Sequence, residues 1–365
     1  MKVALVCDWY HPRVGGIELH LNDLAIRLGA AGHDVVVITP TPGDTHVNGV
    51  RVRRIDAPRA PKFGFLTTRA GVRLVGDAIA NEQADVAHCH VSIVSPAALG
   101  GALHAERRRI PTVVTFHSVV PRTDLLARAA GIALGSREWR VRYTAVSKRV
   151  ARDVQPFGGN APVDVLPNGI DVGFWRVNPV PSAGDAVRLV SVMRLNPKKR
   201  PLALVAMMER LRTLPVNLRI VGDGPERVWL ERAVASSGLA DRIEICGRLS
   251  REEIRALLAK SDVFVLPTVR ESFGLAALEA RCAGLPVVGM ARSGVSEIIA
   301  HEREGLLARS DVEFAAHIAT LVRDREKREA IAAHNRATVP NCDWPRVIDA
   351  HLAVYREAIA LRASV

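Results

Sequence analysis

Two glutamates that flank a glycine-containing step, Glu271 and Glu279, are the residues whose types and spacing best suit chemistry. Between them, Phe273-Gly274-Leu275 opens a segment that favours helix, so its backbone N–H groups would lack acceptors at the positive end of a helix dipole. Such a helix end binds phosphate, and Gly274 lets a phosphate approach the main chain. Carboxylates suit hydroxyl groups instead. The pattern therefore indicates a site for a sugar nucleotide, in which sugar and ribose flank a diphosphate.

The flanking residues predict the elements that hold this step. Val263–Leu266 is a short apolar run typical of a buried strand, and it ends at Pro267. Leu275–Cys282 favours helix through its Ala, Leu and Glu content, and Ala283-Gly284 ends it. Pro286–Gly289 is predicted as the next strand. Strand, loop, helix and strand in this order form one right-handed crossover of a parallel sheet.

A cationic pair, Arg194 and Lys199, is the second feature that could do chemistry. It follows the predicted strand Val187–Val192. Two positive charges at a strand-to-helix turn would oppose the negative charge that develops on a leaving diphosphate. The chain contains no Asp-x-Asp sequence that could hold a divalent ion for this purpose. We therefore expect a reaction that needs neither a metal ion nor another cofactor.

The first half of the chain also predicts a doubly wound parallel sheet. Lys2–Cys7 and Asp34–Thr39 are predicted strands on either side of Gly15-Gly16 and a helix over residues 17–30. The loop is not G-x-G-x-x-G, and no acidic residue ends the second strand, so a dinucleotide cofactor is disfavoured. No P-loop sequence is present either.

Histidines end two further predicted strands of the first half. His117 follows the strand Pro111–Thr115, at the position where open α/β sheets bind their ligands. His88-Cys89-His90 is expected at the end of the strand Ala84–His88. A metal site at this histidine pair is disfavoured because no third ligand lies nearby in the sequence.

These segments resemble the retaining GT-B glycosyltransferases of family 4, also called glycosyl transferases group 1, which use nucleotide sugars. Glu271 to Glu279 is similar to the family's E-x7-E signature. Arg194 and Lys199 match its G-R-L-x-x-x-K-G pattern, although Met193 and Arg200 replace the two glycines. The other similar segments are Ala283-Gly284-Leu285-Pro286-Val287, Ser293-Gly294 with Glu297, Pro167-Asn168-Gly169-Ile170-Asp171 and Ile243 to Leu249.

The resemblance implies a role for each matched residue. Glu271 would accept hydrogen bonds from the donor sugar and Glu279 from the ribose, while His117 would face the sugar near the reacting carbon. Arg194 and Lys199 would stabilise the leaving group. The catalytic set is thus His117, Glu271, Arg194 and Lys199. The donor-binding set is Gly15, Gly16, Arg194, Lys199, Arg248, Leu249, Glu271, Ser272, Phe273, Gly274, Leu275 and Glu279.

The implied fold is GT-B, an α/β architecture of two Rossmann-like doubly wound domains facing across a cleft. Residues 1–177, joined by the C-terminal helix 344–365, would form the acceptor domain. Residues 178–343 would form the donor domain. The implied reaction moves a sugar from a UDP- or GDP-sugar to an acceptor hydroxyl with retention of configuration. Two alternatives stay open: a nucleotide-sugar epimerase of the same shape, and a non-catalytic homologue that only binds nucleotide sugar.

The amino-acid composition limits the classes of partner that we expect. Scattered cysteines, five in number, and the absence of a long apolar run favour a cytoplasmic protein with free thiols. The net charge of +12 suits anionic substrates or lipid headgroups, whereas 4% aromatic residues offer few stacking platforms for nucleic acid. Basic segments from Arg59 to Arg73 and from Arg122 to Arg142 motivate the hypothesis of peripheral contact with an anionic membrane and a lipid-linked acceptor. A glycan or small-molecule acceptor fits the sequence equally well.

Overall fold

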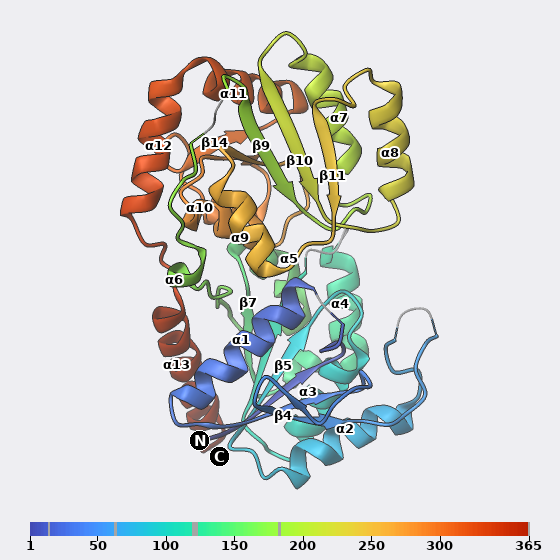
Figure 1. Cartoon of the computed structure of the whole chain (residues 1–365). Coiled ribbons are helices and arrows are strands. Elements are labelled where there is room, and N and C mark those ends of the chain that lie inside the picture. Colours follow the sequence, from blue (N-terminus) through green and yellow to red (C-terminus); the bar gives the residue numbers. More distant parts are fainter. Residues whose placement is uncertain (14, 62–63, 119–122, 182–183, 364–365) are drawn as a thin grey trace. The chain divides into compact units, whose positions relative to one another are not determined.

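The chain alternates strands and helices throughout. The computed structural model describes residues 1–13, 15–61, 64–118, 123–181 and 184–363 (Figure 1). Contacts divide the chain into two units, residues 1–169 with 344–365 and residues 170–343. Residues 170–177, which the sequence placed in the first domain, belong to the second unit. There the Ile170 N–H donates to the Cys342 carbonyl oxygen over 2.9 Å.

Within the described residues, the first unit contains an eight-stranded sheet with the order β3-β4-β2-β1-β5-β6-β7-β8. All neighbours pair in parallel except β3 and β4, which form a hairpin. The turn of that hairpin, Asn48-Gly49, has both residues at positive φ, as a two-residue turn requires. The strands are β1 (Lys2–Cys7), β2 (Asp34–Thr39), β3 (His46–Val47), β4 (Val50–Arg54), β5 (Val86–Val91), β6 (Thr112–Phe116), β7 (Arg142–Ala145) and β8 (Val163–Val165).

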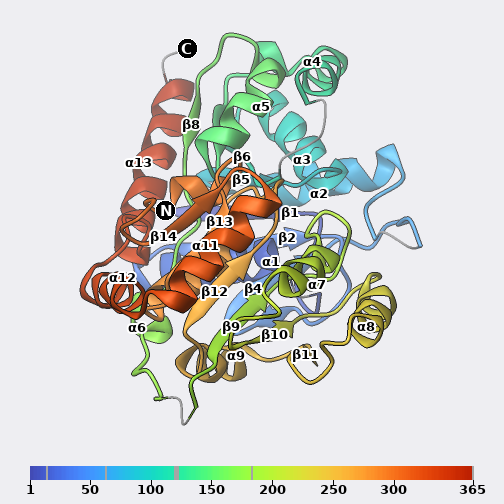
Figure 2. The same ribbon diagram turned by 90° about the horizontal axis from the view of Figure 1, so that it is seen from above.

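Helices cover both faces of this sheet. The last helix of the chain packs beside the first one and against β5, β6 and β7, although more than 300 residues separate the two helices (Figures 1 and 2). The other helices contact one another in pairs over the sheet. The helices are α1 (Gly16–Ala30), α2 (Arg69–Asn81), α3 (Pro96–Arg107), α4 (Thr123–Leu134), α5 (Lys148–Gly158), α13 (Trp344–Ala363) and the 3-10 turn η1 (Ser136–Glu138).

The second unit forms a six-stranded, wholly parallel sheet in the described part of the chain, with the order β11-β10-β9-β12-β13-β14. Its strands are β9 (Val187–Val192), β10 (Val216–Val221), β11 (Ile243–Gly247), β12 (Val263–Leu266), β13 (Val287–Met290) and β14 (Gly305–Ala308). Its helices are α6 (Val172–Trp175), α7 (Pro201–Arg210), α8 (Arg227–Ser236), α9 (Arg251–Ala259), α10 (Leu275–Cys282), α11 (Asp311–Arg323), α12 (Arg325–Ala337) and the 3-10 turn η2 (Gly294–Glu297). Two doubly wound units confirm the predicted fold class.

Two local expectations need correction. β5 runs on to Val91, so His88 and His90 lie inside the strand and not at its end. The basic segment from Arg122 to Arg142 is divided between elements: α4 covers Thr123–Leu134, and Arg142 already belongs to β7. Arg122, and Lys62 and Phe63 of the other basic segment, lie outside the described residues. None of the helices described is long and apolar enough to cross a lipid bilayer.

Five histidines lie in the core of the first unit: His20, His88, His90, His117 and His351. His88 bonds Tyr355 through Nδ1 (2.8 Å) and Thr115 through Nε2 (2.6 Å), and the His351 ring bonds the Val347 carbonyl oxygen (2.7 Å). Burial lowers the pKa of all five; that of His117 falls to about 3 and that of His351 to about 4. These rings are therefore neutral in the folded protein near neutral pH.

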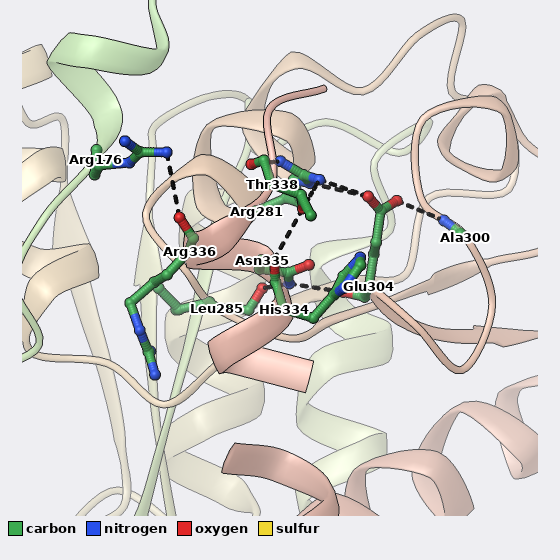
Figure 3. A network of polar contacts seen from close by, with 9 residues as sticks. All are labelled: Arg176, Arg281, Leu285, Ala300, Glu304, His334, Asn335, Arg336 and Thr338. Carbon is green, nitrogen blue, oxygen red and sulfur yellow. Dashed lines mark hydrogen bonds and ion pairs between the residues drawn. The ribbon is translucent and has the colours of Figure 1, made fainter. Parts of the chain in front are cut away.

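A buried arginine ties together three elements of the second unit (Figure 3). Arg281, on α10, pairs with Glu304 (2.6 Å) and donates to the carbonyl oxygen of Thr338 (2.8 Å). The second carboxylate oxygen of Glu304 accepts the Ala300 N–H. Asn335 of α12 donates to the carbonyl oxygens of Leu285 and Glu304. The network fixes α10 against the residues that lead into β14 and against the end of α12.

We expect Arg281→Ala to destabilise the protein by about 3–5 kcal/mol, because it leaves the mostly buried Glu304 carboxylate without its cation. Urea unfolding followed by circular dichroism measures this loss. The control is Arg325→Ala, which removes an exposed pair with Glu329 and should leave the urea midpoint unchanged. Equal effects of both substitutions would show that the Arg281 network contributes little.

The five histidines predict that stability falls as pH drops below about 6.5. Their folded pKa values lie below the unfolded value, so the unfolded chain takes up protons first, at roughly 1.4 kcal/mol per pH unit for each histidine. Asp8 acts in the opposite sense, since burial raises its pKa to about 6, but it is one group against five. Urea midpoints at pH 7.5, 6.5 and 5.5 should decrease in that order. His351→Leu should reduce this slope, whereas the exposed control His46→Gln should not; a midpoint independent of pH would contradict the prediction.

Candidate active site

The candidate donor residues of the second unit follow the carboxyl ends of neighbouring parallel strands. Arg194 and Lys199 follow β9, Arg248 and Leu249 follow β11, and residues 271–275 follow β12. Since β11, β10, β9 and β12 are adjacent in the sheet, these loops meet at one edge. The structure therefore gathers at one end of the second unit what the sequence spreads over about 80 residues.

Close backbone contacts set the path of the Arg194 loop. The Met193 N–H donates to Val221 O (3.0 Å), and the Leu195 N–H donates to Asp223 O (3.0 Å). Gly222 and Gly224 have positive φ, and a Cβ on either would come within 1.8 or 2.3 Å of a carbonyl oxygen in this loop. The Gly222-Asp223-Gly224 turn, weak as a sequence signal, thus supports the segment that presents the exposed Arg194 guanidinium.

Lys199 and Glu271 form an ion pair with Nζ 2.5 Å from Oε2. The Glu271 side chain is 11% exposed and that of Lys199 is 29% exposed, so water reaches the pair mainly from the lysine side. The pair joins the loops after β9 and β12, which are 72 residues apart in sequence. The sequence assigned the two residues separate roles and did not predict their contact.

Arg200 stands where the family pattern has glycine, and its backbone adopts the left-handed conformation (φ 58°, ψ 48°) that a glycine would adopt freely. That conformation costs a non-glycine residue about 1–2 kcal/mol. The side chain offsets this by pairing with Asp311 (2.6 Å) and donating to the Pro267 carbonyl oxygen (3.1 Å). The loop keeps its turn, and Arg200 anchors it to the end of β12.

The N-terminus of α10 is open, as the sequence predicts. Gly274 caps the helix with φ at +101° and, as a glycine, supplies no side-chain cap bond to the first turn. The first intrahelical bond runs from the Leu278 N–H to Gly274 O, so the N–H groups of residues 275–277 have no acceptor within the helix. The helix thus begins two residues later than the Phe273 amide that the sequence included. A Cβ at Gly274 would come within 2.9 Å of the Val295 side chain, so any other residue there would be strained by both this contact and the positive φ.

The remaining donor candidates lie on α10 and on the loops that follow β11 and β12. Phe273 is buried, while Ser272, Leu275, Leu249 and Glu279 are half-buried. Arg248 is exposed, and its Nε lies 3.3 Å from a carboxylate oxygen of Asp223. Gly294 approaches the Glu271 loop so closely that its N–H donates to Glu271 O (2.8 Å). Ser293-Gly294, matched in sequence only by resemblance, therefore supports the loop that carries Glu271.

The other sequence-predicted residues lie in the first unit. Gly15 caps α1, and Gly16 is its first residue. Val14 lies outside the described residues. His117 directly follows β6 and is buried, and its N–H donates to Val91 O (2.9 Å). Its ring Nε2 lies 2.9 Å from Nδ1 of His90, a contact that the sequence did not predict.

Sequence reasoning also missed a hollow of about 790 Å³ in the first unit. Trp9, Arg13, Asp56 and Arg59 contribute side chains to its wall. The Arg13 guanidinium packs over the Trp9 ring (4.7 Å to the centroid) and lies 3.4 Å from Glu18 on the first turn of α1. The residues Asp8 and Trp9 directly after β1 could have indicated this hollow, because they follow the carboxyl end of a central strand, where α/β sheets bind ligands.

No cluster suited to a metal ion occurs among the described residues, counting groups of three or more His, Cys, Asp and Glu side chains. His88 of the H-x-H pair uses both ring nitrogens for bonds to Tyr355 and Thr115. The buried pair is therefore part of a hydrogen-bond network.

Comparison with known proteins identifies the family of this chain. Residues 178–338 match the family described as glycosyl transferases group 1, and residues 14–174 match glycosyltransferase family 4. The chain is 30% identical to the glycogen synthase of Mycobacterium tuberculosis, with 98% of this chain and 95% of that protein covered. It is also 30% identical to the GDP-mannose-dependent alpha-mannosyltransferase of Mycolicibacterium smegmatis, with 100% and 99% covered.

A solved structure shows the same fold. Anabaena HepE in complex with UDP and glucose has a TM-score of 0.75 and 21% identity, with 100% of both chains covered. Both halves of the sequence match the family, and relatives align over nearly the whole chain. The chain therefore belongs to the glycosyl transferases group 1, the family 4 glycosyltransferases of GT-B fold.

Proposed function

We propose that this glycosyltransferase moves a sugar from a nucleoside-diphosphate sugar to an acceptor hydroxyl, with retention of configuration and without a metal ion. The observation that carries the proposal is the arrangement of groups at the carboxyl end of the strands of the second sheet. There an open helix N-terminus, the Lys199–Glu271 pair and the exposed Arg194 lie on the loops that follow two adjacent strands, β9 and β12. The cations and the helix-end amides suit the diphosphate, and the carboxylates of Glu271 and Glu279 suit the hydroxyl groups beside it.

The leaving group is stabilised by charges held in place before it forms. When the bond between the anomeric carbon and the diphosphate breaks, negative charge grows on the phosphate oxygens. Arg194, Lys199 and the amides of residues 275–277 oppose that charge without a metal ion. Lys199 is held by Glu271 in the absence of substrate. A bound diphosphate would share the lysine, and Glu271 would then accept a hydrogen bond from a sugar hydroxyl.

Glu279 lies within α10, about one turn after its N-terminus, and is assigned to the ribose hydroxyls of the donor. In the first unit, His117 is assigned to the sugar, and Gly15-Gly16 at the start of α1 to closure over the donor. The hollow beside Trp9 is assigned to the acceptor, because an aromatic ring with flanking arginines and Asp56 suits a polar, hydroxyl-bearing molecule.

The donor base is proposed to be uracil or guanine. The mycobacterial relative is named as GDP-mannose-dependent, and HepE was solved with UDP. Both nucleotides present the same diphosphate and ribose to the helix end, so the base must be distinguished by the loop after β11, where Arg248 and Leu249 lie.

A panel of UDP, GDP, ADP and their sugar conjugates tests the donor site by thermal shift, first with a chelator and then with magnesium. One nucleotide should stabilise the protein regardless of metal, by about 2.7 kcal/mol at ~100 times its dissociation constant. Glu279→Ala and Lys199→Met should reduce this stabilisation, whereas the neighbouring exposed Lys198→Met should not. Absence of any shift would overturn the donor site, and a shift that requires magnesium would overturn metal independence.

A lipid-linked acceptor at an anionic membrane surface is the second part of the proposal. On α4, Leu125 (77% exposed) and Ile132 (61% exposed) accompany the exposed Arg128. Apolar side chains next to a cation suit the interface of an anionic membrane, and the net charge of +12 adds long-range attraction.

We expect the protein to sediment with phosphatidylglycerol vesicles at about 0.01 M salt and to lose this binding near 1 M salt, where the Debye length is about 3 Å. Leu125→Glu with Ile132→Glu should weaken the binding. Val228→Glu, which alters an exposed apolar side chain on α8 (53% exposed), is the control. Protein that stays in solution at low salt would exclude the membrane contact and favour a glycan or small-molecule acceptor.

A further inference from the structure

The ring of His117 bonds a second histidine inside the first unit. His90 Nδ1 lies 2.9 Å from His117 Nε2, and both residues are buried. His90 is on β5, and His117 follows β6, the strand paired with it; His90 pairs in register with Thr115, two residues before His117. The backbone is fixed at the same place, because the His117 N–H donates to Val91 O. The two rings therefore cannot move independently.

A bond between two neutral imidazoles contains one proton, so one ring donates and the other accepts. Both rings are neutral because burial lowers their pKa values. The direction follows from the other nitrogen of His90: Nε2 is buried and has no hydrogen-bond partner in the part of the chain described. If His117 donated its Nε2–H to His90 Nδ1, the proton of the His90 ring would lie on His90 Nε2. That buried N–H would have no acceptor, which folded proteins rarely tolerate.

Neighbouring groups do not offer His90 another arrangement. The His88 ring packs against it with centroids 4.0 Å apart, but His88 is held by Tyr355 and Thr115. The His117 ring is bonded through Nε2, which leaves Nδ1 as its other ring nitrogen. Nδ1 is thus the atom that His117 can offer to a ligand.

We propose that His90 is a positioning residue for the transfer reaction: it donates its Nδ1–H to His117 Nε2 and so holds His117 as the tautomer that carries its proton on Nδ1. His117 then presents an N–H donor to the sugar, not a lone pair. The proposal rests on the proposed function of His117 at the donor sugar. It adds which nitrogen acts, in which protonation state, and which residue imposes that state.

The chemical consequence is directional. A neutral ring that donates from Nδ1 bonds an oxygen of the sugar or of the leaving group without adding a positive charge. The opposite tautomer would turn a lone pair toward the ligand, which could accept a hydrogen bond from a sugar hydroxyl but would repel a phosphate oxygen of the leaving group. Loss of the His90 donor should therefore lower turnover more than donor binding, since the second unit supplies most of the groups assigned to the nucleotide.

Two substitutions separate the bond from the packing. His90→Asn places an amide N–H near the position of the imidazole Nδ1–H and should keep the tautomer. His90→Leu fills space without donating. Two-bond 1H–15N spectra of 15N-histidine-labelled protein report the protonated nitrogen of each ring, and the His117 signals are identified by their loss in His117→Asn. Release of nucleoside diphosphate from UDP-glucose and GDP-mannose measures kcat and KM.

We expect Nδ1–H on His117 in the wild type and in His90→Asn, and a shift of the proton to Nε2 in His90→Leu. With the donor that is turned over, kcat should fall about 10- to 100-fold in His90→Leu, by analogy with the loss of a group that orients a metal-bound histidine. KM should change less than twofold. His90→Asn should restore most of the rate.

A proton on His117 Nε2 in the wild type overturns the proposal, and so does an unchanged tautomer in His90→Leu. A tautomer shift without loss of kcat overturns the catalytic part. If the wild type turns over neither nucleotide sugar, the proposed function fails, while the spectra still decide what His90 does to His117. Equal loss of rate in His90→Asn and His90→Leu, with the tautomer unchanged in the former, would overturn the role of the bond in turnover.

Discussion

Backbone segments that lie too close together to admit a side chain hold the candidate donor site in shape. A Cβ at Gly222 would come within 1.8 Å of the Met193 carbonyl oxygen, and one at Gly294 within 2.2 Å of the Ser272 carbonyl oxygen. Each contact joins loops that follow different strands. The loops that carry Arg194 and Glu271 therefore take their positions from neighbouring loops. Charged groups arranged before substrate binds are what stabilisation of a developing charge requires.

Ion pairs complete that arrangement in two ways. Lys199 and Glu271 pair at the surface that the donor would use, so substrate can compete for both groups. Arg200 with Asp311, and Arg281 with Glu304, pair away from it and serve the scaffold. Arg281 is on the same short helix as Glu279, so the buried network behind α10 fixes the helix whose open end faces the site.

The first unit contains five histidines in its core. Histidines from α1, β5, the end of β6 and α13 occupy a region that a typical α/β unit fills with aliphatic side chains. Their rings are uncharged because burial lowers their pKa values, and hydrogen bonds to Tyr355 and Thr115 satisfy His88 completely. His20 and His90 each retain a buried ring nitrogen without a partner in the described residues. Protonation of either nitrogen would place a charge in the core, which is why we predict that the stability of this unit falls at acid pH.

The sequence by itself determined the local units. Apolar runs, helix-forming stretches and glycines set β12, Gly274 and α10, since each depends on residues close in the chain. Ser250 and Glu253 likewise form a capping box between residues three apart in the chain. Only the tertiary structure decided which distant side chains meet: Lys199 pairs with Glu271 because β9 and β12 are neighbours in the sheet, and His90 reaches His117 because β5 and β6 are. Strand order and side-chain direction arise from packing of the whole unit, and no pattern within one segment encodes them.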